Sequence, residues 1–137
     1  MVFEQKKSWY IYVIEMSGEG IGFGKAILFN EHFVVYGLPA IVSAIDKYTR
    51  ARVESISQSG WKLNDVRKAT LNYKEEKINQ QKDSINLIFK KMDIDLSKKG
   101  LEIILDGTLY CASGIGASAA SCVAIARALS NHFELNH

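Results

Sequence analysis

Cysteine is scarce in this sequence. Only Cys111 and Cys122 occur among 137 residues, and their spacing matches no zinc-binding pattern. Two thiols do not make a disulfide framework, so this is not a small secreted domain held together by disulfides. We therefore expect two reduced, partly buried cysteines, as is usual in a cytoplasmic protein.

Long hydrophobic runs and a strong excess of one charge are also absent. The apolar stretch Tyr10–Ile14 is too short to span a membrane, and Glu15 interrupts it. No signal-peptide pattern is present, so we expect an intracellular, cytoplasmic protein without a membrane partner. The formal net charge of +2 is too small to indicate a nucleic-acid partner. Residues 61–100 hold ten of the 17 Lys and Arg residues, which is more typical of a solvated helical face than of a binding patch.

What remains is an ordinary globular composition with recognisable strands. A hydrophobic content of 47% over 137 residues suits one domain with a real core. Apolar and β-branched runs predict strands at 9–16, 26–29, 48–56 and 100–107. The second of these is expected to be short and buried. The third is expected to be half exposed, with Arg50, Arg52 and Glu54 opposite Ala51 and Val53.

Helices are predicted in the second half of the chain. From about Glu75, apolar residues recur at a period of 3.6; they are Ile78, Ile85, Ile88, Phe89 and Met92. Residues 114–130 predict a helix of small residues, and 32–37 a short helix or turn that stops at Gly37. Residues 40–45 are ambiguous and 57–74 are expected to be irregular. This order predicts a two-layer α+β fold.

Two glycine-rich segments invite a nucleotide-binding interpretation. In the first, residues 17–25, the glycines fit neither the Walker nor the dinucleotide spacing, and a flexible turn between strands is expected. In the second, Gly114 and Gly116 directly precede a predicted helix. A helix N-terminus offers unpaired N–H groups and a positive dipole end, and glycine lets a phosphate approach closely. A small-residue helix packed tightly on a sheet explains the same pattern, so both interpretations stay open.

Three charged or polar residues, Lys25, Glu31 and His32, interrupt an otherwise apolar segment. A zinc site is not supported, because the other histidines, His132 and His137, lie at the far end of the chain. No nucleophile elbow is present either. One interpretation is an ion pair between Lys25 and Glu31 with His32 as a satisfied interior histidine. The other is that Lys25 faces a phosphoryl group while Glu31 and His32 orient a hydroxylated substrate.

The two segments together resemble a known family. "GKAILFNEHFVVYGLPA" resembles the first motif of mevalonate kinases, which belong to the GHMP kinases, and "SGIGASAASCVAIARALS" resembles the second motif of the wider family. The order is correct and the gap is about eighty residues. Galactokinase-like members carry an aspartate where this chain has Val34, which favours the mevalonate kinases.

The resemblance implies a fold, a reaction and a set of site residues. The fold would be the two-layer N-terminal domain of a GHMP kinase, a ribosomal-protein-like βα fold. The reaction would be transfer of the ATP γ-phosphoryl group to the 5-hydroxyl of mevalonate with Mg²⁺. Lys25 would be catalytic and contact the phosphates, while Glu31 and His32 would line the mevalonate site. The loop around the ATP phosphates would comprise Ala112, Ser113, Gly114, Ile115, Gly116, Ala117 and Ser118, with Ser118 also a ligand of Mg²⁺.

The chain departs from the family pattern at several places. Asn30 replaces a small residue, Ala117 replaces the first serine of the second motif, and Tyr110 to Ala112 replace a proline-rich lead-in. The resemblance also implies that residues 1–137 are only the N-terminal part. The catalytic aspartate, a Mg²⁺-ligating glutamate and a ferredoxin-like second domain would lie beyond His137. We expect such a fragment to be inactive alone and to associate, for example as a homodimer.

Two other functions remain open on the sequence. The first is a GHMP kinase that acts on a different small alcohol. The second is a non-catalytic RNA-binding or sensor module, because the same superfold, with its left-handed β-α-β crossover, serves several functions. Such a module would carry a basic face with exposed aromatic rings, for which Trp61 and Tyr73 are the candidates.

Overall fold

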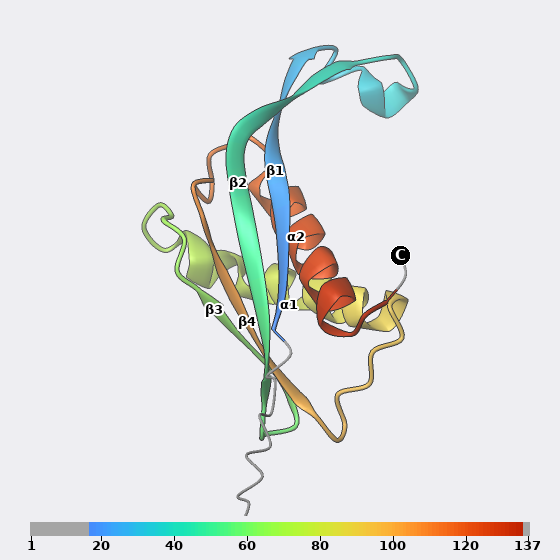
Figure 1. Cartoon of the computed structure of the whole chain (residues 1–137). Coiled ribbons are helices and arrows are strands. Elements are labelled where there is room, and N and C mark those ends of the chain that lie inside the picture. Colours follow the sequence, from blue (N-terminus) through green and yellow to red (C-terminus); the bar gives the residue numbers. More distant parts are fainter. Residues whose placement is uncertain (1–16, 136–137) are drawn as a thin grey trace, which may run out of the picture.

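The computed structural model describes residues 17–135, which form one mixed sheet covered on one face by two helices (Figure 1). The sheet has the strand order β1-β2-β4-β3, in which β3 is parallel to β4 and the other neighbours are antiparallel. This arrangement confirms the two-layer α+β prediction. In chain order the elements are β1 (Gly18–Phe29), the 3₁₀ helix η1 (Val34–Tyr36), β2 (Ile41–Ile56), β3 (Gly60–Asp65), α1 (Tyr73–Lys91), β4 (Gly100–Gly107) and α2 (Ala117–His132).

The core lies between the sheet and the helices. Alternation along β2 points Ala51 and Val53 inward, where both side chains are fully buried. The other core side chains come from β4, α1 and α2; they are Leu101, Ile103, Leu105, Ile85, Phe89, Ala124, Ile125, Ala128 and Leu129. The predicted amphipathic helix and the predicted strands at 48–56 and 100–107 are therefore confirmed.

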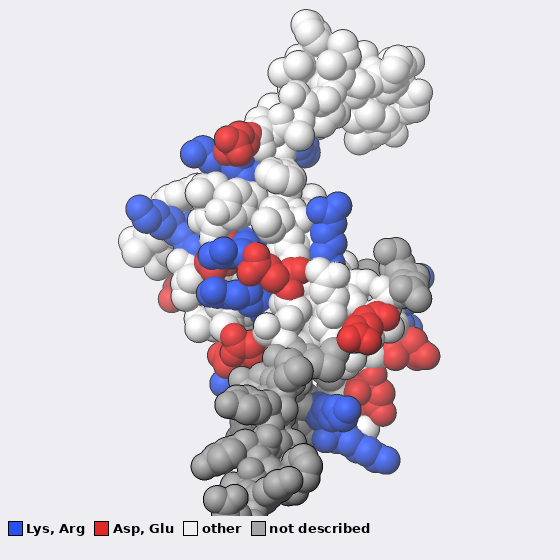
Figure 2. All heavy atoms as spheres, in the orientation of Figure 1, with Lys and Arg blue, Asp and Glu red and all other residues white. Residues whose placement is uncertain are grey.

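Within residues 17–135 no helix covers the opposite face of the sheet, which is polar. Arg50 and Arg52 of β2 both contact Asp106 of β4, at 2.8 and 3.1 Å. Lys62 of β3 pairs with Glu102 of β4 at 3.2 Å. Figure 2 shows acidic and basic side chains intermixed on this face. The charges are thus largely paired with one another.

The glycine-rich segment at 17–25 is a strand, so the prediction of a flexible turn is wrong. Gly18, Gly20 and Gly22 alternate along β1 and are all buried against α2. A Cβ atom added at these positions would lie 2.1, 2.3 and 2.1 Å from the carbonyl oxygens of residues 128, 124 and 120. The strand therefore lies with its backbone directly against the helix backbone, and this close approach requires glycine.

β1 is an edge strand, and α2 covers its free edge. The carbonyl oxygen of Glu19 accepts a hydrogen bond from Asn131 Nδ2 at 2.7 Å. The carbonyl oxygen of Ile21 accepts one from Arg127 Nη1 at 2.9 Å. Two side chains of the helix thus satisfy backbone groups that an exposed edge would offer to another chain.

Other expectations were wrong or lie outside the described residues. The segment 57–74 contains β3, whose short alternation places Trp61 and Leu63 against the core between polar neighbours. The strand at 26–29 exists as the end of β1, but it is not buried, since Phe29 is 68% exposed. The ambiguous residues 40–45 belong mostly to β2. The strand predicted at 9–16 falls outside the described residues.

The ends of β1 and β2 project beyond the helices and carry η1 (Figure 1). We call residues 28–42 the arm. Figure 2 shows the upper part of the arm without charged side chains on the face presented. Its large apolar side chains are all exposed; they are Leu28, Phe29, Phe33, Val34, Val35, Tyr36, Leu38, Ile41 and Val42. The short helix or turn predicted at 32–37, with its stop at Gly37, is confirmed as η1.

Candidate phosphate-binding site

The loop before α2 has the backbone geometry of an anion site. Ala112, Gly114 and Gly116 have φ values of +68°, +72° and +82°, while the residues between them do not have positive φ. Alternation of this kind directs successive backbone N–H groups toward one side and forms an anion-binding concavity. Gly116 is the N-cap of α2 and supplies no side-chain cap, so N–H groups of the first turn remain available.

Lys25 of β1 lies against this loop. Its backbone N–H donates to the carbonyl oxygen of Ile115 at 2.9 Å. A Cβ atom added at Gly116 would lie 2.9 Å from Cγ of Lys25, so the aliphatic part of the lysine packs directly on Gly116. The structure therefore brings Lys25 together with the loop from which it is about ninety residues distant in sequence. No ion pair among residues 17–135 joins Lys25 to Glu31, which removes the simpler explanation of this lysine.

Glu31 and His32 lie elsewhere, in the turn of the arm between β1 and η1. Both side chains are exposed, so the interpretation of His32 as an interior histidine is wrong. Within residues 17–135 neither forms a hydrogen bond or ion pair with Lys25 or with the loop. Their role at a substrate site stays a prediction.

Asn30 precedes this pair and has φ of +63°, in the left-handed region that favours glycine. Its Nδ2 atom donates to the carbonyl oxygen of Pro39 at 2.9 Å, which closes the turn of the arm. Asparagine tolerates this conformation better than most residues. The departure from the small residue of the family motif is therefore compatible with the same backbone.

Substitutions of Asn30 test whether its backbone conformation explains the presence of asparagine. Asn30→Ala should lower the free energy of unfolding by about 1 kcal/mol, because alanine is strained at positive φ and cannot bond to Pro39. Asn30→Gly should stay within about 0.5 kcal/mol of the original protein, since glycine relieves the strain while losing the bond. Urea titration of the two variants measures the difference. Equal losses would contradict the backbone explanation.

The implied metal ligand, Ser118, lies exposed in the first turn of α2. In the part of the chain that the structure describes, no group of three or more His, Cys, Asp and Glu residues is placed to hold a metal ion. A hydroxyl at a helix N-terminus is a suitable oxygen ligand for a Mg²⁺ ion that is held mainly by nucleotide phosphates.

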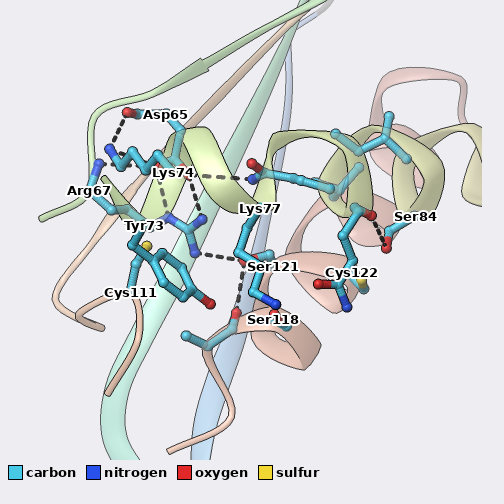
Figure 3. Close-up of a pocket in the computed structure, with 15 residues that line it drawn as sticks. Asp65, Arg67, Tyr73, Lys74, Lys77, Ser84, Cys111, Ser118, Ser121 and Cys122 are labelled. Carbon is cyan, nitrogen blue, oxygen red and sulfur yellow. Dashed lines mark hydrogen bonds and ion pairs between the residues drawn. The ribbon is translucent and has the colours of Figure 1, made fainter. Parts of the chain in front are cut away.

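A cavity of about 80 Å³ lies between α1 and the first two turns of α2 (Figure 3). Arg67, Lys74 and Lys77 give its lining a basic character, and both free cysteines contribute to it. Burial raises the pKa of the Cys111 thiol. Serine and tyrosine hydroxyls complete the polar part of the lining; they belong to Tyr73, Ser84, Ser118 and Ser121.

The sequence pattern does not predict the buried charge cluster beside this cavity. Arg67 follows β3, and its Nε and Nη2 atoms donate to the two oxygens of Asp65 at 2.9 and 2.6 Å. Nη1 donates to Thr49 Oγ1 at 3.1 Å and to Ser121 Oγ at 2.6 Å. Lys74 Nζ lies 3.6 Å from Asp65. The available signal was a serine, Ser121, that shares the buried face of the second predicted helix with mostly apolar residues.

The cluster fixes the charge of Asp65. Burial alone would raise the pKa of this carboxyl, but the hydrogen bonds and the charge of Arg67 outweigh burial, with a smaller contribution from Lys74. The pKa of Asp65 therefore lies below its ordinary value of 3.8. A carboxyl group with a lowered pKa stabilises the fold above its unfolded-state pKa, and that stabilisation is lost as the pH falls.

We accordingly expect acid to weaken the fold through Asp65. The free energy of unfolding should fall as the pH is lowered through about 4, and Asp65→Asn should reduce this slope. The variant should also be less stable at pH 7 by about 3 kcal/mol, because Arg67 is left buried without its counter-charge. Denaturant titrations from pH 7 to pH 3 test this. Asp83→Asn, an exposed carboxylate on α1, is the control that should keep the original slope.

Known proteins are similar to this chain in both fold and sequence. Residues 79–137 match the GHMP kinases N terminal domain. The mevalonate kinases of Thermococcus sibiricus and Pyrococcus abyssi are 31% and 32% identical, each over 81% of this chain. The crystal structure of L. major mevalonate kinase in complex with R-mevalonate superposes with a TM-score of 0.84 at 41% identity, over 90% of this chain.

These similarities concern only part of each relative. The chain spans 38% and 37% of the two archaeal proteins and 39% of the L. major chain. The family match at residues 79–137 contains the loop before α2. Residues 79–137 thus match the N-terminal domain of GHMP kinases, and the chain as a whole is similar to the N-terminal portion of mevalonate kinases.

Proposed function

We propose that the protein, in its full length, transfers the γ-phosphoryl group of ATP to the 5-hydroxyl of mevalonate. The observation that carries this proposal is the packing of Lys25 on Gly116, at the N-terminus of α2. A lysine and a ring of backbone N–H groups at one place form a receptor for a polyphosphate. We take mevalonate as the acceptor alcohol because the relatives are named mevalonate kinases.

Each site residue then has a role. The loop 112–118 holds the phosphates through backbone N–H groups, and Lys25 stabilises the charge that develops during transfer. Ser118 would hold Mg²⁺ beside the phosphates. The ion supplies charge neutralisation when it is bound. Glu31 and His32 would orient the alcohol, once the rest of the protein completes the cleft around the arm.

The transfer breaks the bond between the γ-phosphorus of ATP and the β,γ-bridging oxygen, which leaves as part of ADP. It forms a bond between the γ-phosphorus and the acceptor oxygen. The acceptor hydroxyl must also give up a proton to a base. We place that base, an aspartate in the family, beyond residues 17–135. The chain of 137 residues is therefore expected to bind nucleotide without turning over mevalonate.

The test is a coupled assay of ADP formation by the full-length gene product. With ATP and Mg²⁺, we expect mevalonate to support turnover and phosphomevalonate and galactose to support little. The chain of residues 1–137 is assayed beside it and should be inactive. Absence of mevalonate-dependent ADP formation by the full-length protein would refute the proposal that mevalonate is the acceptor. Turnover of a different small alcohol would support the alternative GHMP kinase.

The non-catalytic alternative has less support. Trp61 is not a free stacking platform, since its Nε1 donates to Asn86 and its ring packs on Phe89 at 6.0 Å. The arginines of the open sheet face are paired with Asp106. An RNA-binding surface would present such groups unpaired.

A further inference from the structure

Arg67 connects three elements that meet under the candidate phosphate loop. Its side chain is 4% exposed. One end of the guanidinium is held by Asp65 in a bidentate pair, which fixes the plane of the group. The remaining nitrogen, Nη1, donates to Thr49 on β2. It also donates to Ser121 on α2 (Figure 3).

Ser121 connects Arg67 to the start of α2 through two hydrogen bonds. Its Oγ atom accepts from Arg67 at 2.6 Å and donates to the carbonyl oxygen of Ala117 at 2.8 Å. Ala117 is the first residue of α2 and directly follows Gly116. Two hydrogen bonds therefore connect the Arg67–Asp65 pair to the first turn of α2, which is the proposed phosphate-binding turn.

We infer that Arg67 and Ser121 are positioning residues for the phosphate-binding turn of α2. The inference rests on the proposed function, because it assumes that this turn receives the nucleotide. Neither side chain need touch the ligand. Their effect is to hold the N–H groups in the orientation that the phosphates require, before the ligand arrives.

A purely structural role for Arg67 would give a different result from a positioning role. A substitution of Thr49 distinguishes these two roles. Thr49→Val and Ser121→Ala each remove one hydrogen-bond acceptor from the same nitrogen of Arg67. Thr49 is fully buried on β2 and makes no hydrogen bond to α2, whereas Ser121 bonds to the first turn. If Arg67 only stabilises the fold, both variants should affect nucleotide affinity equally. If Arg67 positions the turn, only Ser121→Ala should lower the nucleotide affinity.

The experiment measures steady-state kinetics of the full-length protein and its thermal midpoint. Ser121→Ala should raise the KM for ATP about tenfold, as expected for loss of a hydrogen bond to a charged group. Its KM for mevalonate should change less than about twofold, because that site lies away from the turn. Thr49→Val should lower the thermal midpoint at least as much and leave both KM values within about twofold. Ser121→Thr keeps the hydroxyl and should restore the KM for ATP.

Each outcome is decisive. An equal KM for ATP in the Ser121→Ala and Thr49→Val variants overturns the inference while the proposed function stands. If the full-length protein does not act on mevalonate, titration with adenylyl imidodiphosphate and Mg²⁺ replaces the kinetic readout, with the same tenfold expectation for the dissociation constant. If the unsubstituted protein does not bind that analogue, both the phosphate site and this inference are wrong.

Discussion

Gly20→Ala should remove a large share of the stability of the fold. The added Cβ atom would lie 2.3 Å from the carbonyl oxygen of Ala124 and 2.5 Å from the amide nitrogen of Ala128. Both atoms belong to a helix backbone and cannot rotate away, so β1 and α2 must separate. We expect a loss of about 3 kcal/mol or more, a large share of the stability of a domain of this size.

Guanidinium titration followed by circular dichroism measures this loss. Glu19→Ala is the matched control, because it puts the same residue on the same strand but on the exposed face. It should stay within about 0.5 kcal/mol of the original protein. A loss below about 1 kcal/mol for Gly20→Ala would mean that strand and helix are not held at this distance.

Lys25→Met should have the second large effect, on catalysis alone. Methionine keeps the aliphatic contact with Gly116 but lacks the charge that would stabilise the transferring phosphoryl group. In the full-length protein we expect kcat to fall about 100- to 1000-fold, which is typical of removing one electrostatic contact from a transition state. The thermal midpoint should change little.

The control for this variant is Lys47→Met, which removes an exposed lysine from β2. It should keep the original kcat, which excludes a general effect of lowering the net charge. Retention of more than about a tenth of the activity by Lys25→Met would contradict a catalytic role for this lysine. Loss of binding to ATP without loss of kcat would assign it to substrate binding alone.

Periodicity predicted the parts of the fold that have one buried and one exposed face. Val53 and Ala51 alternate with arginines, and Ile85 and Phe89 recur at helical spacing, so burial could be read from the pattern. β1 could not be found in this way, because its buried positions are Gly18, Gly20 and Gly22. Their role depends on a helix about a hundred residues later in the sequence, which no local pattern reports.

The candidate site was predictable to a similar degree. Glycines at 114 and 116 before a helix made this loop a candidate anion site, although a small-residue helix packed on a sheet explained the same pattern. The partnership of Lys25 with that loop came from the family resemblance and not from spacing. Ser121 gave the only hint of the buried cluster, because Arg67 itself is recognisable as buried only when its acceptors on three separate elements are known.

The contact between β1 and α2 also constrains the order in which the chain can assemble. β1 offers glycine on its inner face, so it has little apolar surface of its own with which to adhere to a growing core. Its partner on that face is α2, which begins at Ala117. During synthesis β1 can therefore pack on α2 only after nearly the whole of residues 17–135 has been made. We expect the pairing of β1 with α2, and with it the meeting of Lys25 and its loop, to be a late and slow step of folding.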